Sequence, residues 1–378
     1  MKKAILSLSI LAAMSGASQA QSNVTLYGNV DAAVAVTNSG APGAANAVSV
    51  TSGTAVASYW GIRGSEDMGG GLKAMFVLQS GLDVDTGAAK TYSGNPSTAT
   101  PAAPGGAPVT GLFNMRSFVG LEGNFGSVSL GRDYTPLYWV LVDADPFRLG
   151  LYGNSQEIVL LSGTGSDRFG RASNAVFYVS PKFAGFQARV MYSLGSESAG
   201  AAGTPPKDAN RMWAVSGHYV AGPLVVSGAY QQIELPTVAG TAFTGSTGTR
   251  KDAIIAARYI IGDYSVGAGY FNVKQPVPNS DARDVWLGGT ATLGTGTFMA
   301  MVQRMRQDAA VGAEKKGTIF GLGYIHPLSK RTALFATYGE VINSSTATFA
   351  LTGSDNTVAP GAAGAHVKAL ATGIRHSF

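Results

Sequence analysis

The strongest constraint in this sequence is an alternation of apolar and polar side chains at every second position. Near the start of the chain, Val24, Leu26 and Val30 share one parity. Thr25 and Asn29 occupy the other parity. Neighbouring side chains of a β-strand point to opposite faces, whereas a helix would repeat its apolar residues three and four apart. The pattern therefore predicts strands with one apolar face and one polar face.

This alternation recurs in sixteen segments, from the start of the chain to its last residue. Their boundaries are soft by a few residues, and they fall at 24–36, 54–64, 72–80, 115–122, 127–133, 174–180, 186–194, 211–220, 224–234, 252–261, 264–273, 283–293, 296–306, 317–326, 331–341 and 366–378.

The links between the segments alternate between short and long. The link at 66–71 is short, and the links on either side of it, at 37–53 and 81–113, are long. Further short links lie at 123–126, 181–185, 221–223, 262–263, 294–295 and 327–330. Further long links lie at 134–173, 195–210, 235–250, 274–282, 307–316 and 342–365. Bacterial outer-membrane barrels have short periplasmic turns and long external loops, whereas a soluble sandwich has no reason to sort its links this way. We therefore predict an all-β fold, an antiparallel transmembrane β-barrel of sixteen strands.

Length and composition agree with such a barrel. Charged residues make up only 13% of the 378 residues, yet no mature segment approaches eighteen consecutive apolar residues. Strands with one face in lipid and the other in water reconcile these two observations. Sixteen strands allot roughly 22 residues to each strand and its link, which suits tilted strands of about 9–11 residues plus loops. A barrel of this size encloses a water-filled channel, whereas eight strands would fill with side chains.

The first twenty residues predict a signal peptide. Lys2 and Lys3 precede a short apolar run, and Ser18 and Ala20 supply the small residues that a signal peptidase recognises. The apolar run is only about ten residues long, about half of what a spanning helix needs. We expect cleavage after Ala20, so that residues 1–20 are the signal peptide and residues 21–378 form the barrel.

The charge and the absence of cysteine exclude several classes of partner. Removing the two lysines of the signal peptide leaves 25 basic and 22 acidic residues, a net charge of +3. The basic residues form no cluster of the kind that nucleic-acid binding needs. With no cysteine, an exported chain has neither disulfides nor thiolate metal sites.

Catalysis needs a nucleophile, a base and an orienting group, and the sequence offers no such set. The four histidines are His218, His326, His366 and His376, and none lies in a nucleophile motif. No metal-ligand spacing and no glycine-rich phosphate loop is present. We therefore predict no enzyme activity, no metal and no cofactor, against the alternative of an outer-membrane lipase or protease.

Several short motifs resemble those of the Gram-negative general porins of β-proteobacteria. They occur in order along the chain, at residues 60–74 (WGIRGSEDMGGGLKA), 118–121 (FVGL), 124–126 (NFG), 130–137 (LGRDYTPL), 180–186 (SPKFAGF) and 372–378 (TGIRHSF). Each motif alone is weakly specific, but together they are specific. The resemblance implies a homotrimer in outer-membrane lipid, in which each subunit has its own pore for small hydrophilic solutes and ions. It also implies that the third long loop, 134–173, folds into the barrel and narrows it.

A loop that faces a basic wall across a pore creates a transverse field that aligns the dipoles of passing solutes and sets the ion preference. The candidate acidic side consists of Asp143, Asp145 and Glu157 on the third loop. The candidate basic side consists of Arg63, Lys73, Arg116 and Arg132.

Strand parity tests the basic side. Parity turns Arg63 and Lys73 toward the lumen, because their apolar neighbours face lipid. Arg116 is ambiguous, because its segment has apolar residues on both parities. Strict alternation turns Arg132 outward, unless it lies at a strand end where parity fails. The alternative is that all these charges are ordinary rim or lumen residues.

Two positions depart from the family pattern. Related porins commonly carry arginine where Tyr59 and Met115 stand here. The loss of two wall cations predicts a pore that is only mildly selective, and an aromatic side chain at the wall could guide less polar solutes.

The terminal Phe378, on an alternating strand, resembles the recognition signal for the outer-membrane assembly machinery. The predicted function is a general diffusion porin. The main alternative is a substrate-specific channel of the same fold, which the sequence does not separate from it.

Overall fold

The computed structural model describes residues 23–90, 92–93, 108–109, 111–160, 170–195, 209–239, 242–276, 279–309 and 311–378. The predicted signal peptide and the first two residues of the predicted mature chain lie outside the described residues.

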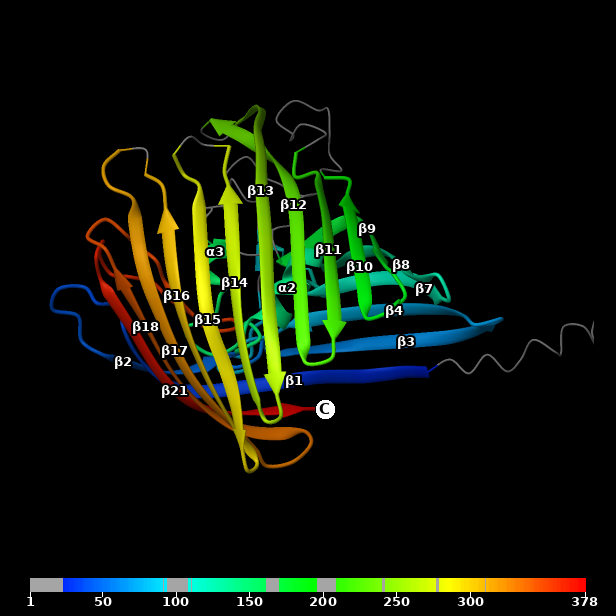
Figure 1. Cartoon of the computed structure of the whole chain (residues 1–378), viewed down its shortest axis with the longest axis horizontal. Helices are drawn as coiled ribbons and strands as arrows, with labels where there is room; N and C mark the ends of the chain where they lie inside the picture. The colour runs from blue at the N-terminus through cyan, green and yellow to red at the C-terminus, as the bar shows by residue number, and fades with distance from the viewer. Residues whose placement is uncertain are drawn as a thin grey trace, which may run out of the picture.

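Sixteen long strands form one closed antiparallel barrel, in which neighbours in sequence pair with each other and β21 pairs back to β1 (Figure 1). The strands are β1 (Asn23–Asn38), β3 (Tyr59–Gly69), β4 (Leu72–Gly81), β7 (Arg116–Gly123), β8 (Gly126–Tyr134), β9 (Arg171–Val179), β10 (Phe186–Ser193), β11 (Met212–Ala221), β12 (Leu224–Ala239), β13 (Ala242–Ile261), β14 (Tyr264–Lys274), β15 (Ala282–Leu293), β16 (Gly296–Gln307), β17 (Lys315–Pro327), β18 (Thr332–Asn343) and β21 (His366–Ser377). Each predicted segment corresponds to one of these strands, so the predicted fold class is confirmed.

The first long link contains a strand that the sequence analysis did not predict. β2 (Ala47–Ser52) pairs with the second half of β1, whereas β3 pairs with its first half. The second predicted strand accordingly begins at Tyr59 rather than at residue 54. Residues 53–58 instead turn inward between β2 and β3, where Thr54 and Ser58 are fully buried.

The remaining elements also lie in the long links. They are α2 (Pro136–Ala144), α3 (Glu157–Leu160) and the short strands β5 (Tyr92–Ser93), β6 (Pro108–Val109), β19 (Leu351–Thr352) and β20 (Thr357–Val358). Thr135 caps α2 by accepting a hydrogen bond from the Tyr138 backbone N–H at 3.2 Å, and Pro136 occupies the first turn. Among the described residues, neither helix is long and apolar enough to cross a bilayer.

The inner wall of β14 to β18 is largely apolar, unlike the polar lumen face that alternation predicts. Phe271, Trp286, Met305, Ile319 and Phe335 point inward and are almost fully buried. Large apolar residues also cover the outer face of these strands, as expected for a surface in lipid. The inner apolar wall is covered by the third long loop, and the main hydrophobic core lies between that loop and the wall.

The barrel closes where the last residue meets the first strand. Phe378 and Gly28 exchange two backbone hydrogen bonds, with N···O distances of 3.0 and 3.1 Å. The Phe378 ring covers Gly28 so closely that a Cβ atom there would lie 2.4 Å from the ring. The C-terminus accordingly lies beside β1 in Figure 1.

Candidate pore constriction

The third long loop, between β8 and β9, folds inside the barrel. Helix α2 contacts the inner faces of β10 to β14. Beyond it, Phe147 packs against Gly321 and Leu151 against Gly323, both on β17. The glycines leave room for these side chains because they carry no Cβ atom. The loop therefore lies against one side of the barrel and leaves the channel on the other side.

Hydrogen bonds fix the loop to the wall and to the last long link. The Gln303 Nε2 on β16 donates to the carbonyl oxygens of Gly153 and Asn154 at 2.6 and 2.8 Å. The Tyr152 N–H donates to Thr337 Oγ1 at 3.1 Å. The Gly153 N–H donates to the Thr352 carbonyl at 3.1 Å. These bonds satisfy the buried polar backbone of the loop, which a purely apolar wall would leave without partners.

Two of the three predicted loop carboxylates are buried. Asp145 is 0% exposed, and it accepts hydrogen bonds from the Phe147 N–H at 2.7 Å and from the Ser155 N–H and Oγ at 2.7 and 2.8 Å. Burial raises the pKa of Asp145 to about 6, although these hydrogen bonds act in the opposite direction. Glu157 is 4% exposed and accepts a hydrogen bond from the Ala350 N–H at 2.6 Å. Burial raises the pKa of Glu157 to about 8.

These placements differ from the pore-lining positions expected for Asp145 and Glu157, because Asp145 turns into the loop and Glu157 turns toward Ala350 in the last long link. Asp143 is the predicted loop carboxylate that is half-exposed. Its Oδ2 lies 3.7 Å from His218 Nδ1 on β11, and its Oδ1 lies 4.0 Å from Arg148 NH1.

On the opposite wall, Arg63 and two tyrosines lie side by side. The Arg63 guanidinium carbon is 4.9 Å from the centre of the Tyr27 ring, and the Tyr27 and Tyr59 rings meet edge to face at 6.0 Å. All three side chains have the inward parity that the sequence predicts for Arg63. Lys73, also of inward parity, lies opposite Asp67 and Glu122 on the neighbouring strands, near the short turn that follows β3.

Arg116, which was ambiguous by parity, lies on the inner face of β7. Its Nε is 2.6 Å from Asp133 Oδ1 and its NH2 is 2.9 Å from Asp133 Oδ2. This geometry is the two-pronged arrangement that makes arginine–carboxylate pairs strong. The guanidinium carbon also lies 5.2 Å from the centre of the Phe118 ring.

Arg132 is 6% exposed and lies where the register of β8 and β9 shifts, between Gly131 and Asp133. Gly131 has a φ of +133°, and this irregularity overrides the strict alternation that would turn Arg132 into lipid. The Arg132 Nε donates to the Asn114 carbonyl at 2.8 Å and its NH1 to Ser173 Oγ at 2.9 Å. Its guanidinium therefore ties loop and strand together instead of facing the open channel.

The two departures from the family pattern have different environments. Tyr59 is half-buried on the inner wall beside Tyr27. Met115 is 1% exposed, and its Sδ accepts a hydrogen bond from Gln79 Nε2 at 3.4 Å. Only Tyr59 therefore presents a surface to passing solutes.

Five further residues of this region were not named as site residues from the sequence. Tyr134 and Tyr138, at the start of the third loop, stack at 4.1 Å, and the Arg171 guanidinium lies 4.7 Å from the Tyr134 ring centre. Arg189 on β10 lies 5.2 Å from the Trp139 ring centre. Its inward parity was readable from the alternation of β10, whereas its approach to Trp139 depends on how the loop folds.

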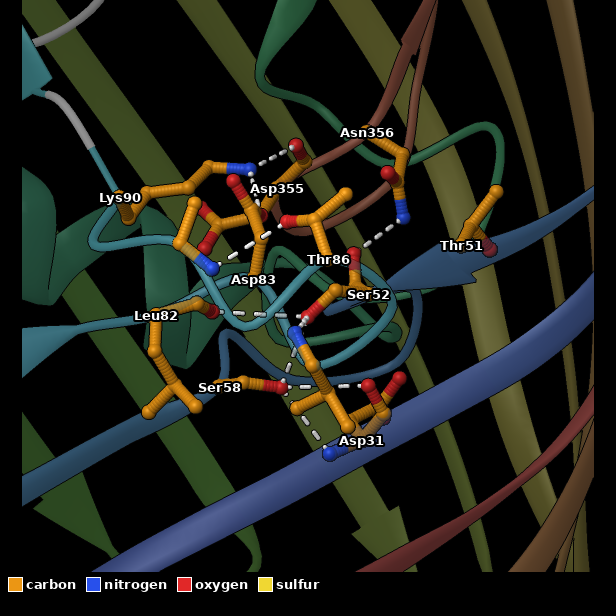
Figure 2. Close-up of polar contacts among 12 residues, drawn as sticks. Asp31, Thr51, Ser52, Ser58, Leu82, Asp83, Thr86, Lys90, Asp355 and Asn356 are labelled. Carbon is orange, nitrogen blue, oxygen red and sulfur yellow. Dashed lines mark hydrogen bonds and ion pairs between the residues drawn. The ribbon is translucent and has the colours of Figure 1, made fainter.

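The first, second and last long links are joined by a polar network (Figure 2). The Asp31 carboxylate on β1 accepts hydrogen bonds from the N–H groups of Thr54, Ala55 and Val56, at 2.8, 3.2 and 3.1 Å. Asn356 Nδ2 donates to the Ser52 carbonyl at 2.7 Å. Lys90 Nζ lies 2.8 Å from Asp83 Oδ1 and donates to the Asp355 carbonyl at 3.2 Å. The network joins these three links to one another.

Within the described ranges, no group of three or more His, Cys, Asp or Glu side chains could hold a metal ion. A closed sixteen-stranded barrel, narrowed by an inward-folded loop between charged walls, defines a transmembrane diffusion channel. Residues 7–346 match the model of the Gram-negative porin family, and the chain belongs to that family.

Curated relatives agree with this membership. The chain is 33% identical to the outer membrane porin protein 32 of Delftia acidovorans over 389 residues, with 100% of both chains covered. It is 28% identical to an outer membrane porin protein of Bordetella pertussis, with 90% of this chain and 94% of that one covered. The protein is therefore a multi-pass porin of the outer membrane, and its family is one of channels rather than enzymes.

Solved structures give the same fold. The anion-selective porin from Comamonas acidovorans superimposes with a TM-score of 0.77 at 28% identity, covering 95% of this chain and 100% of that one. A trimer form of OmpT from Vibrio cholerae superimposes with a TM-score of 0.64 at 16% identity, covering 94% and 99%, and this likeness bears on the fold alone.

Proposed function

We propose that this porin is a general diffusion channel with only a mild preference for anions. The observation that carries the proposal is the pairing of Arg116 with Asp133, which neutralises a wall cation at the constriction. Tyr59 and Met115 add no charge where the family resemblance implies arginine. Arg63 and Arg189 keep the balance slightly positive, whereas Asp143 supplies the negative side on the loop.

The selectivity is tested by the reversal potential of single channels in a KCl gradient. A mild anion preference gives a potential well short of the Nernst limit for chloride, because both ions pass. A potential close to that limit would contradict the proposal, since it would mean that the wall excludes cations.

The breadth of solutes is tested by liposome swelling with a size series of neutral sugars. A general channel gives rates that fall smoothly with solute size. Saturable uptake of one sugar would instead favour the substrate-specific alternative. No catalytic step is part of the proposal.

We extend the proposal to assembly as a homotrimer, supported by the family resemblance. Crosslinking of the protein in native outer membranes tests it, and a species of three chains is the expected product. We also assign Phe378 to recognition by the assembly machinery. The variant Phe378→Ala should reach the outer membrane in lower yield while refolding in detergent at an unchanged rate; equal losses in both would mean that Phe378 only closes the barrel.

A further inference from the structure

A cavity of about 200 Å³ opens on the inner wall of β7 to β10, beside the start of the third loop. The part of its lining that matters for recognition consists of Arg116, Phe118, Asp133, Tyr134, Trp139 and Arg189. It therefore combines two guanidinium groups with several aromatic rings at the edge of the channel. Its volume lies below the roughly 300–1,000 Å³ of pockets for drug-sized ligands, so its size suits a solute with a single ring.

Of the four charged side chains that line this cavity, Arg116 and Asp133 are paired with each other. Both nitrogens that Arg116 turns toward Asp133 are used by that carboxylate. Glu122, at the side of the cavity, lies directly opposite Lys73 in the register of β4 and β7. Opposite charges in such a cross-strand position attract each other.

Arg189 is the exception. In the part of the chain that the structure describes, its side chain makes one hydrogen bond, from NH2 to Gln187 Oε1 at 3.4 Å, and no ion pair within 4.0 Å. Asp143 and Asp133 are the carboxylates that influence it from a greater distance. The Arg189 guanidinium therefore keeps N–H donors for an anionic group of a solute. The two oxygens of a carboxylate match the spacing of two neighbouring N–H groups of a guanidinium.

The aromatic side chains of the cavity provide a second recognition feature, contact with a ring of the solute. The Trp139 ring lies 5.2 Å from the Arg189 guanidinium, and the Phe118 ring lies 5.2 Å from that of Arg116. A flat ring entering the cavity meets aromatic partners, and stacked or edge-to-face contacts at 4.5–7 Å are favourable. Recognition of both features favours a solute that carries a carboxylate on one aromatic ring.

We propose that this cavity is a transit site for small aromatic carboxylates, with Arg189 binding the carboxylate and Trp139 and Phe118 contacting the ring. The proposal rests on the proposed passage of small solutes through this lumen. The site faces water on the channel side, so binding is weak, with dissociation constants on the order of millimolar. Weak binding suits a channel, because a solute must leave as readily as it enters.

The test uses single-channel recordings of the full-length protein in planar bilayers bathed in KCl. Benzoate is the probe, acetate is the matched anion without a ring, and benzyl alcohol is the matched ring without a charge. Benzoate should reduce the current with millimolar half-effect, and each matched solute should need at least about tenfold more. If benzoate and acetate reduced the current equally, the proposal would be overturned, since the channel would then recognise the charge of the solute and not its ring.

Variants locate the site. Arg189→Gln should weaken the benzoate effect at least about fivefold, and Trp139→Leu should do the same. Trp139→Phe keeps a ring and should retain most of the effect, which separates ring contact from mere loop structure. Arg63→Gln is the matched control, because it removes a lumen cation outside the cavity. If Arg63→Gln weakens the benzoate effect as much as Arg189→Gln, the effect comes from the general field and the site does not exist.

Calorimetric titration of the detergent-solubilised protein with benzoate gives a second measurement that does not depend on conduction. A channel that binds benzoate but conducts no KCl would contradict the proposed function and leave the site intact. A channel that conducts KCl without heat of binding for benzoate would contradict the site alone.

Discussion

Arg116 and Asp133 face each other across neighbouring strands, with Nε 2.6 Å from Oδ1 and NH2 2.9 Å from Oδ2. Each side chain is largely shielded from water. The pair places a positive and a negative charge together on the inner wall, beside the start of the third loop, so that passing ions experience a weak field there. The charge balance of the pore accordingly depends on this contact as much as on the number of arginines.

The first prediction removes the negative member of the pair. Asp133→Asn should raise the permeability ratio of chloride over potassium by a factor of about 2–5, because a unit charge nearby contributes about 1 kcal/mol in a watery lumen. Reversal potentials measure the ratio. Asp263→Asn, in the exposed turn after β13, should leave it unchanged. An unchanged ratio in Asp133→Asn would show that Arg116 is already screened from the channel.

A second prediction concerns the close approach of the third loop to β17. Gly153 has a φ of +88°, and a Cβ atom there would lie 2.7 Å from the Gly321 Cα. Gly153→Ala should therefore displace the loop from the wall and increase both single-channel conductance and current noise. The backbone conformation alone costs about 1–2 kcal/mol.

The matched control is Gly294→Ala, in a short turn. Gly294 also has a positive φ, of +62°, but no atom lies within 4 Å of the added Cβ. It should leave conductance unchanged. If both variants behave alike, backbone strain rather than the contact with the wall determines the effect.

The third prediction concerns the first long link. Asp31→Asn replaces one acceptor oxygen by an amide nitrogen, so that the N–H groups of Thr54, Ala55 and Val56 lose part of their acceptor set. Hydrogen bonds to a charged acceptor contribute about 1.5–3 kcal/mol. Hydrogen exchange of these amides should accelerate about 10- to 100-fold. Asp85→Asn, on an exposed loop, is the control and should change nothing. If these amides exchanged as slowly in Asp31→Asn as in the native protein, the neighbouring links would hold this segment without Asp31.

The fourth prediction is a pH dependence of loop docking. Burial raises the pKa of Glu157 from 4.5 to about 8, so the docked loop retains a proton that an undocked loop releases at much lower pH. Docking of the loop therefore becomes less favourable as pH rises from about 4.5 to about 8. Current noise should increase over that pH range. Asp145 has a pKa of about 6 and weakens docking in the same direction. Recordings between pH 6.5 and 8.5 isolate the Glu157 contribution.

Glu157→Gln keeps an acceptor for the Ala350 N–H and cannot ionise. Its current noise should stay low and constant across that pH range. If the current noise of Glu157→Gln instead increased with pH up to pH 8, as in the native protein, another group would control the docking.

Much of the barrel could be predicted from the sequence because the patterns that mark its strands and links involve only residues close together in the chain. Alternation gives the strands, and short and long links give the ends of the barrel, since each depends only on neighbouring residues. The inward positions of Arg63 and Lys73 follow from the same parity. Arg132 does not follow this parity, because the strand register shifts at Gly131 and changes the direction of the side chain. No apolar pattern along the chain indicates that shift.

Alternation and the order of short and long links together predict the closed barrel of sixteen strands, and alternation alone predicts the faces of most strands. Only the tertiary structure decided what fills the lumen. Asp145 and Glu157 are buried, and Arg189 meets Trp139, because residues 135–160 of the third loop cross the interior and pack on β10 to β18. Such contacts join residues far apart in sequence, and their geometry depends on the shape of the apolar inner wall, which no periodicity along the chain encodes.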